Sequence, residues 1–164
     1  MILRSVTKTV SIDREPAAVF QFLADATNWP QWAVVNVLSV SPAGDEWWDM
    51  RTPGGPAKLR IRAVASHGLL DHDFVAADAQ WSVPARVVPN AGGSLFMITF
   101  FQPPTFSDKI FDEQVSLVDK ELAKLKELLE RPAEQIGHGS NQDGASGKGV
   151  GGLNKSPMRF DTSN

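Results

Sequence analysis

The chain of 164 residues contains no cysteine and no tyrosine. The absence of cysteine excludes disulfides, thiolate nucleophiles and cysteine-based zinc or iron–sulfur sites. No run of Lys or Arg is present and the formal net charge is -3, so the composition offers no electrostatic basis for binding nucleic acid. No apolar run has the length of a signal peptide or a membrane span. We therefore expect a cytoplasmic protein without a nucleic-acid partner and without membrane insertion.

The aromatic residues are mostly apolar rings. Five Trp and nine Phe occur against no Tyr, and 42% of all residues are hydrophobic. This composition is ordinary for one globular domain, but it is rich in ring surface and poor in phenolic hydroxyl groups. Any internal cavity is therefore predicted to be apolar.

A long amphipathic helix is predicted across residues 105–131. Ser107 has a side chain suited to an N-cap, and Pro132 ends the helical pattern. The apolar residues follow one another at alternating intervals of four and three, which places them on one face of a helix. They are Phe111, Val115, Val118, Leu122, Leu125 and Leu129. Further apolar residues beside this stripe widen it, so we expect it to pack against a sheet.

The N-terminal part predicts one strand and two short helices. Polar and apolar residues alternate from Ser5 to Ile12, as in a half-buried strand, although Lys8 interrupts the apolar side. Pro16 lies near the start of a short helix over residues 15–24. A proline-interrupted segment at residues 27–32 is predicted to add one helical turn.

Residues 33–102 alternate between short apolar runs and turn clusters, which predicts a meander of about six strands. With His67 and Gly68 as a two-residue loop, one hairpin has an apolar face that carries a single histidine. Its cross-strand pairs are Ile61 with Phe74 and Ala63 with His72 on that face, and Arg62 with Asp73 on the other.

A second hairpin is predicted to close at Ala91 and Gly92. Its apolar face pairs Val87 with Phe96, Ala85 with Ile98 and Val83 with Phe100. Pro84 and Pro89 predict that pairing is interrupted in this strand. The reverse side is more apolar than a solvated face should be, which predicts a homodimer contact. The residues of that contact are Val88, Leu95, Met97 and Phe101.

The composition changes after Arg131. Residues 132–164 are rich in Gly and Ser, with only isolated apolar residues. Such a segment cannot bury enough apolar surface to offset its ordering entropy, so we expect a disordered tail. The predicted folded domain is residues 1–131.

The predicted order of strand, two short helices, meander and long helix resembles the SRPBCC superfamily. Segments 9–25 and 28–32 and the final helix through Leu129 carry this resemblance. The superfamily includes START domains, birch-pollen allergen relatives and polyketide cyclase/dehydrase-like proteins. It implies an α+β helix-grip fold, in which a seven-stranded antiparallel sheet wraps around a long C-terminal helix, with two short helices after the first strand. It also implies a cavity between sheet and helix, but no universal catalytic residue.

His72 is predicted to face this cavity, where it could act as a general acid/base or be a hydrogen-bonded structural residue. Asp71 and Asp73 cannot be its partners, because neighbouring strand residues point to opposite faces. The same alternation separates His67 and the two aspartates from His72 as metal ligands, so no metal or other cofactor is expected.

Arg60 and Arg62 share the opposite face with Lys58. An arginine clamp for a carboxylate ligand is one interpretation. A solvated face on which Arg62 pairs with Asp73 is favoured, because the reverse side of the strand is apolar.

The leading hypothesis is the binding or carriage of a hydrophobic small molecule, a lipid, fatty acid or aromatic polyketide-like metabolite, between sheet and C-terminal helix. One alternative is a cyclase- or dehydratase-type enzyme that uses His72 as general acid/base. The other is a dimeric interaction protein without a ligand. The predicted ligand-binding residues are Trp32, Trp48, Ile61, His72, Phe74, Trp81, Val83, Ala85, Phe96, Ile98, Phe100, Phe111, Val115, Val118 and Leu122.

Overall fold

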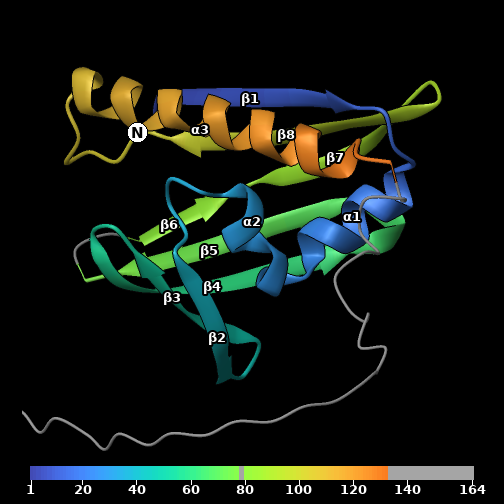
Figure 1. Ribbon diagram of the computed structural model, residues 1–164. Helices are drawn as coiled ribbons and strands as arrows, with labels where there is room; N and C mark the ends of the chain where they lie inside the picture. Colours follow the sequence, from blue (N-terminus) through green and yellow to red (C-terminus); the bar gives the residue numbers. More distant parts are fainter. Residues whose placement is uncertain (78–79, 133–164) are drawn as a thin grey trace, which may run out of the picture. The chain divides into compact units, whose positions relative to one another are not determined.

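A computed structural model of the chain describes residues 1–77 and 80–132 (Figure 1). The strands are β1 (Ser5–Ile12), β2 (Ser39–Gly44), β3 (Trp47–Thr52), β4 (Gly55–Val64), β5 (Leu69–Ala76), β6 (Gln80–Val83), β7 (Ala85–Asn90) and β8 (Gly93–Phe101). The helices are α1 (Pro16–Ala24), α2 (Trp29–Trp32) and α3 (Asp108–Leu129), with short 3₁₀ turns η1 (Ala26–Asn28) and η2 (Ala65–His67). The predicted tail lies outside the described residues.

The strands form one antiparallel sheet in the order β1-β8-β7-β5-β4-β3-β2, and β6 pairs with β5 beside this path. The first strand pairs with the last strand, while the other neighbours follow from the meander. The sheet curves, and all three α-helices lie on its concave side (Figure 1). Helix α3 runs along β1 and contacts α2. The predicted helix-grip α+β fold is confirmed.

Helix α3 forms as its sequence predicts. The Ser107 hydroxyl accepts a hydrogen bond from Ile110 N at 3.3 Å, which caps the first turn. The predicted apolar stripe is buried along its whole length, from Phe111 to Leu129. Lys8, which interrupts the apolar side of β1, places its ammonium group 2.8 Å from Oδ2 of Asp119 on α3. The charged residue in β1 therefore joins strand to helix through an ion pair.

The β4–β5 hairpin differs from the predicted register by two residues. Ile61 pairs with His72, where Phe74 was predicted, because the turn spans residues 65–68 and contains the 3₁₀ turn η2. Gly68 ends this turn in the left-handed conformation, with φ of 62°. Because side chains alternate with a period of two, a shift by two leaves every residue on its predicted face.

The β7–β8 hairpin has the predicted pairs of Val87 with Phe96 and Ala85 with Ile98. The predicted pair of Val83 with Phe100 is wrong, because Val83 pairs with His72 of β5. Pro84 separates the two strands, so the segment predicted as one strand forms both β6 and β7.

An ion-pair cluster occupies the outer face opposite His72. The Asp73 carboxylate accepts hydrogen bonds from Arg60 Nη2 at 2.8 Å, Arg62 Nη2 at 3.0 Å and Ser82 Oγ at 2.7 Å. Burial raises the pKa of Asp73, but the Ser82 hydrogen bond and the two guanidinium groups outweigh it, so the pKa lies below its ordinary value. The predicted pairing of Arg62 with Asp73 is confirmed, although the two residues are diagonal neighbours.

Replacement of Gly68 by Ala should destabilise the domain strongly. A Cβ at this position would lie 2.1 Å from the backbone oxygen of Val87 and would require a left-handed alanine. We expect the free energy of unfolding to fall by about 2–4 kcal/mol, measured by chemical denaturation. Gly92→Ala is the matched control, because a Cβ there meets nothing within 4 Å. Equal stability of the two variants would contradict this account of the turn.

Candidate ligand-binding site

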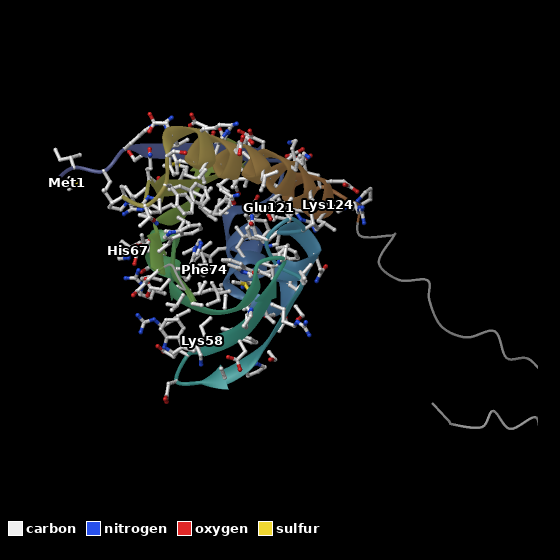
Figure 2. All side chains as sticks on the ribbon, turned by 90° about the vertical axis from the view of Figure 1, so that its left-hand side faces the viewer. Met1, Lys58, His67, Phe74, Glu121 and Lys124 are labelled. Carbon is white, nitrogen blue, oxygen red and sulfur yellow. The ribbon has the colours of Figure 1, made fainter. Side chains whose placement is uncertain are left out.

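The predicted ligand-binding residues all belong to α2, α3 or the concave side of the sheet, which we call the inner face. Those that are buried are Trp32, His72, Val83, Ala85, Phe96, Ile98, Phe111, Val115, Val118 and Leu122. Those that are only partly buried are Trp48, Ile61, Phe74, Trp81 and Phe100. Figure 2 shows Phe74 on the concave side, between α3 and the lower strands. The structure thus brings the predicted set together on facing surfaces.

Seven rings form a row across the inner face. We call Phe106, Trp81, Phe74, His72, Trp29, Trp32 and Phe96 the aromatic row. Neighbouring ring centroids are 5.9 Å apart for Trp81 and Phe106, and 5.6 Å apart for Trp81 and Phe74. At the other end, Trp29 lies 4.9 Å from His72 and 5.4 Å from Trp32, which contacts Phe96 at 6.3 Å. His72 and Phe74 join the two halves, because residues two apart in a strand share a face.

Trp29 and Phe106 were not among the predicted site residues. Trp29 begins the four-residue helix α2, and Phe106 lies in the loop before α3. Neither segment has enough periodicity to show where a side chain points. The only feature of the sequence that pointed to these two residues was their apolar ring. In addition, Trp29 is followed by a proline.

His72 is buried and neutral. Its Nδ1 lies 3.1 Å from the carbonyl oxygen of Leu70, which requires the proton on Nδ1 and leaves Nε2 as an acceptor. Burial lowers the pKa of His72 to about 4, although the Leu70 hydrogen bond opposes this shift. Nε2 has no hydrogen bond with any residue in the described ranges. The Asp71 carboxylate accepts a hydrogen bond from Ala85 N at 3.0 Å, and the Asp73 carboxylate accepts one from Ser82 Oγ at 2.7 Å.

Two indole N–H groups in the aromatic row have no acceptor in the part of the chain that the structure describes. Nε1 of Trp32 and Nε1 of Trp81 are both buried and lack a hydrogen-bond partner among the residues that the structure describes. Trp29 differs, because its Nε1 donates to the carbonyl oxygen of Leu23 at 2.9 Å. Within the described ranges, the inner face therefore presents two unpaired donors and one unpaired imidazole acceptor.

Glu121 is a buried carboxylate that was not among the predicted site residues. It lies on α3 with 4% of its surface exposed, and Figure 2 shows it on the side of the helix that faces the interior. Its Oε1 accepts hydrogen bonds from Val35 N at 3.0 Å, Asn36 N at 2.9 Å and Asn36 Nδ2 at 3.1 Å. Burial raises its pKa, although these hydrogen bonds oppose the shift. The sequence did contain a signal that Glu121 is buried, because it lies three residues after Val118 and next to Leu122, on the apolar side of the helix.

The interior of the described ranges contains no buried cation. The buried polar or charged residues there are His72, Asp73, Ser94 and Glu121. Within residues 1–77 and 80–132, no three or more His, Asp or Glu side chains are grouped so that they could hold a metal ion. His67 lies in the exposed β4–β5 turn, on the outside of the sheet (Figure 2).

Two hollows lie on the surface of the described domain. One, of about 280 Å³, is lined by Ser11, Ile12, Asp13, Asn90, Gly93 and Lys126, among others. The other, of about 450 Å³, lies between α1, the β4–β5 turn and β7, and its lining includes Phe20, Gln21, His67, Val87 and Val88. Neither hollow is lined by a predicted ligand-binding residue.

A curved antiparallel sheet that closes over a C-terminal helix defines the helix-grip class of domain. The family model described as "Polyketide cyclase / dehydrase and lipid transport" matches residues 4–130. The chain belongs to this family, and the resemblance to the SRPBCC superfamily is confirmed. No curated protein matches the sequence. In the described part of the chain, no helix has both the length and the apolarity needed to cross a membrane.

Solved structures show the same fold at low sequence identity. The protein XoxI from Bacillus cereus superposes with a TM-score of 0.64 at 15% identity, covering 77% of this chain and 96% of that one. The di-domain ARO/CYC BexL from the BE-7585A biosynthetic pathway has a TM-score of 0.62 at 16% identity, covering 76% of this chain and 46% of BexL. A START superfamily protein from Mycobacterium smegmatis has a TM-score of 0.55 at 15% identity, covering 76% and 98%. These similarities show the fold alone.

Replacement of Glu121 by Gln should change how stability depends on pH. Because the folded-state pKa is raised above 4.5, the folded domain holds this proton more tightly than the unfolded chain does. The stabilising effect of protonation is complete below that unfolded value, and it is lost as the pH rises through the folded pKa. We therefore expect Glu121→Gln to gain stability relative to the original chain between pH 4.5 and neutral pH, by about 1.4 kcal/mol for each unit of pKa shift.

Denaturation curves across this pH range measure the difference. Glu113→Gln on the exposed side of the same helix is the matched control, and its effect should stay within about 0.5 kcal/mol at every pH. A Glu121→Gln difference that is constant with pH would show that the buried carboxylate is not the group responsible.

Proposed function

We propose that the domain binds and carries a hydrophobic small molecule between its inner face and α3. The observation that carries this proposal is the incomplete burial of Trp48, Ile61, Phe74, Trp81 and Phe100. These large apolar side chains point to the concave side of the sheet, where a closed core would bury them at the density of an organic crystal. Burial of their remaining exposed surface provides the free energy for binding an apolar molecule.

The packing of α3 supports a ligand position under its N-terminal half. Leu122, Leu125 and Leu129 belong to the contiguous apolar cluster of the domain. Phe111 and Val115 are buried but lie outside that cluster. The core is therefore continuous at the C-terminal end of the helix and interrupted toward its start. Rotation of the half-buried side chains opens the space, as commonly occurs when proteins bind ligands.

The family supports this class of ligand without choosing among its members. Its description names both polyketide chemistry and lipid transport, and the structural neighbours include a START superfamily protein and an ARO/CYC protein. Both activities require a site for a hydrophobic molecule. The fold alone does not decide between them.

An enzyme of cyclase or dehydratase type is the second candidate, because His72 is a buried, neutral imidazole with a free acceptor at Nε2. Its weakness is that Nδ1 donates to a backbone carbonyl and that, among the described residues, no carboxylate forms a hydrogen bond with the imidazole. A polyketide-like probe recovered chemically unchanged by mass spectrometry supports carriage. Conversion of the probe that is lost in His72→Ala would favour the enzyme, and conversion retained in that variant would exclude His72 as the acid/base.

The homodimer remains a prediction. Val88, Leu95 and Met97 are half-buried on the outer face, and 43% of the Phe101 surface is exposed. The cytoplasmic location remains a prediction as well.

Replacement of Ile61 by Glu should weaken binding of an apolar probe. Ile61 faces the inner side of β4 and is only partly buried, so the domain should tolerate the change while a bound probe would have to desolvate the new carboxylate. We expect the affinity for the fluorescent probe N-phenylnaphthylamine to fall at least about tenfold. Fluorescence titration measures it.

The matched control is Val64→Glu. Val64 lies on the same strand, faces the other side and has 42% of its surface exposed, so the affinity should be unchanged. If both folded variants bind the probe as tightly as the original chain, the site is not between sheet and helix.

A further inference from the structure

Trp32 carries an N–H donor that is costly unless something accepts from it. It has 3% of its surface exposed, and its Nε1 lacks an acceptor in the described ranges. The Nε1 of Trp81 is in the same state. Buried donors are nearly always paired in folded proteins, so two unpaired indoles on one face call for an explanation. Trp29 in the same row is paired, which shows that the local environment allows pairing.

Aromatic faces do not replace the missing acceptors. Trp32 and Phe96 meet edge to face with centroids 6.3 Å apart, and Trp81 and Phe106 do so at 5.9 Å. A contact between an N–H and a ring is much weaker than a hydrogen bond to oxygen. Both donors therefore keep most of their capacity to bind an oxygen atom of a ligand.

The charges around the inner face disfavour an anionic ligand. No Lys or Arg is buried among the described residues, while the Glu121 carboxylate is. Two cations near the start of the chain that reach α3 are already paired with its acidic residues. Lys8 lies 2.8 Å from Asp119, and Arg4 lies 2.6 Å from Asp112. A carboxylate placed between sheet and helix would lose its hydration without gaining a counter-charge.

We propose that Trp32 and Trp81 are the specificity-determining donors of the site, and that its ligand is a neutral molecule with hydrogen-bond-accepting oxygens such as ketone or ester carbonyls. Free fatty acids and other carboxylates are excluded as preferred ligands. This inference rests on the proposed function, because it assigns the ligand class of the same site. The Nε2 acceptor of His72, between the two indoles in the aromatic row, suits a hydroxyl group on the same molecule.

Three naphthalenes of similar shape, substituted at the same ring position, test the inference on the full chain. Acetylnaphthalene carries a neutral acceptor, isopropylnaphthalene has none, and naphthoate carries a charge. The protein's five Trp give separate indole N–H signals in an NMR spectrum of isotope-labelled protein, which Trp→Phe variants assign. We expect the indole proton of Trp32 or Trp81 to move downfield with acetylnaphthalene and not with isopropylnaphthalene.

The affinities should follow the same pattern. The variant that removes the responding indole, Trp32→Phe or Trp81→Phe, should lower the affinity for acetylnaphthalene roughly fivefold. The same variant should change the affinity for isopropylnaphthalene by less than about twofold. Naphthoate should bind at least about tenfold more weakly than the ketone. Trp47→Phe is the control, because the Trp47 ring lies on the outer face, 4.8 Å from the Arg60 guanidinium, and should leave all three affinities unchanged. Thermal unfolding confirms that each variant is folded.

The outcomes separate the inference from the function on which it rests. If isopropylnaphthalene binds at the inner face but neither indole responds to the ketone, the inference fails while the proposed function stands. Naphthoate that binds as tightly as the ketone overturns the assignment of a neutral ligand. If none of the three compounds binds, the proposed function itself fails.

Discussion

The contact between the apolar stripe of α3 and the inner face of the sheet is the interaction on which the domain depends. The stripe can be buried only if the sheet curves toward the helix, and the pairing of β1 with β8 places the first strand beside it. Ion pairs such as that of Lys8 with Asp119 join β1 to α3 at the edge of this contact. The buried Glu121 accepts a hydrogen bond from Asn36 N, which holds the segment after α2 against the same helix. Removal of α3 would expose the part of the inner face that the helix covers, so fold and site share one set of contacts.

Periodicity was sufficient to predict the main helix and strands, and the resemblance to the SRPBCC superfamily implied how they are arranged. The intervals of three and four along α3 and the alternation in β1 follow from local geometry. They can therefore be recognised in the sequence without knowledge of the rest of the molecule. The β4–β5 register was wrong because a 3₁₀ turn that ends at Gly68 cannot be distinguished by composition from a two-residue loop. The inner face was nevertheless right, since the error was an even number of residues. Pro84 marked the interruption of its strand, but the new partner of Val83 depends on a distant strand.

The site could be predicted only in its regular elements. Three residues of the site were not predicted. Trp29 begins a helix of only four residues, Phe106 lies in a loop, and Glu121 is one of many acids on its helix. The hydrogen-bonding state of the rings could not be predicted from the sequence either. Whether an indole N–H finds a carbonyl, as in Trp29, or finds none, as in Trp32, depends on the packing of neighbouring elements. The same packing sets the neutrality of His72, and it leaves no buried cation in the described ranges.

The most direct test of the central claim is the position of a bound apolar molecule. Nuclear Overhauser effects between N-phenylnaphthylamine and labelled methyl groups locate the probe without any substitution in the protein. A probe between sheet and helix gives effects to Ile61, Val83 and Val115, which come from β4, β6 and α3. Effects confined to Val88, which lines the surface hollow beside α1, would place the probe outside the helix grip and contradict the account.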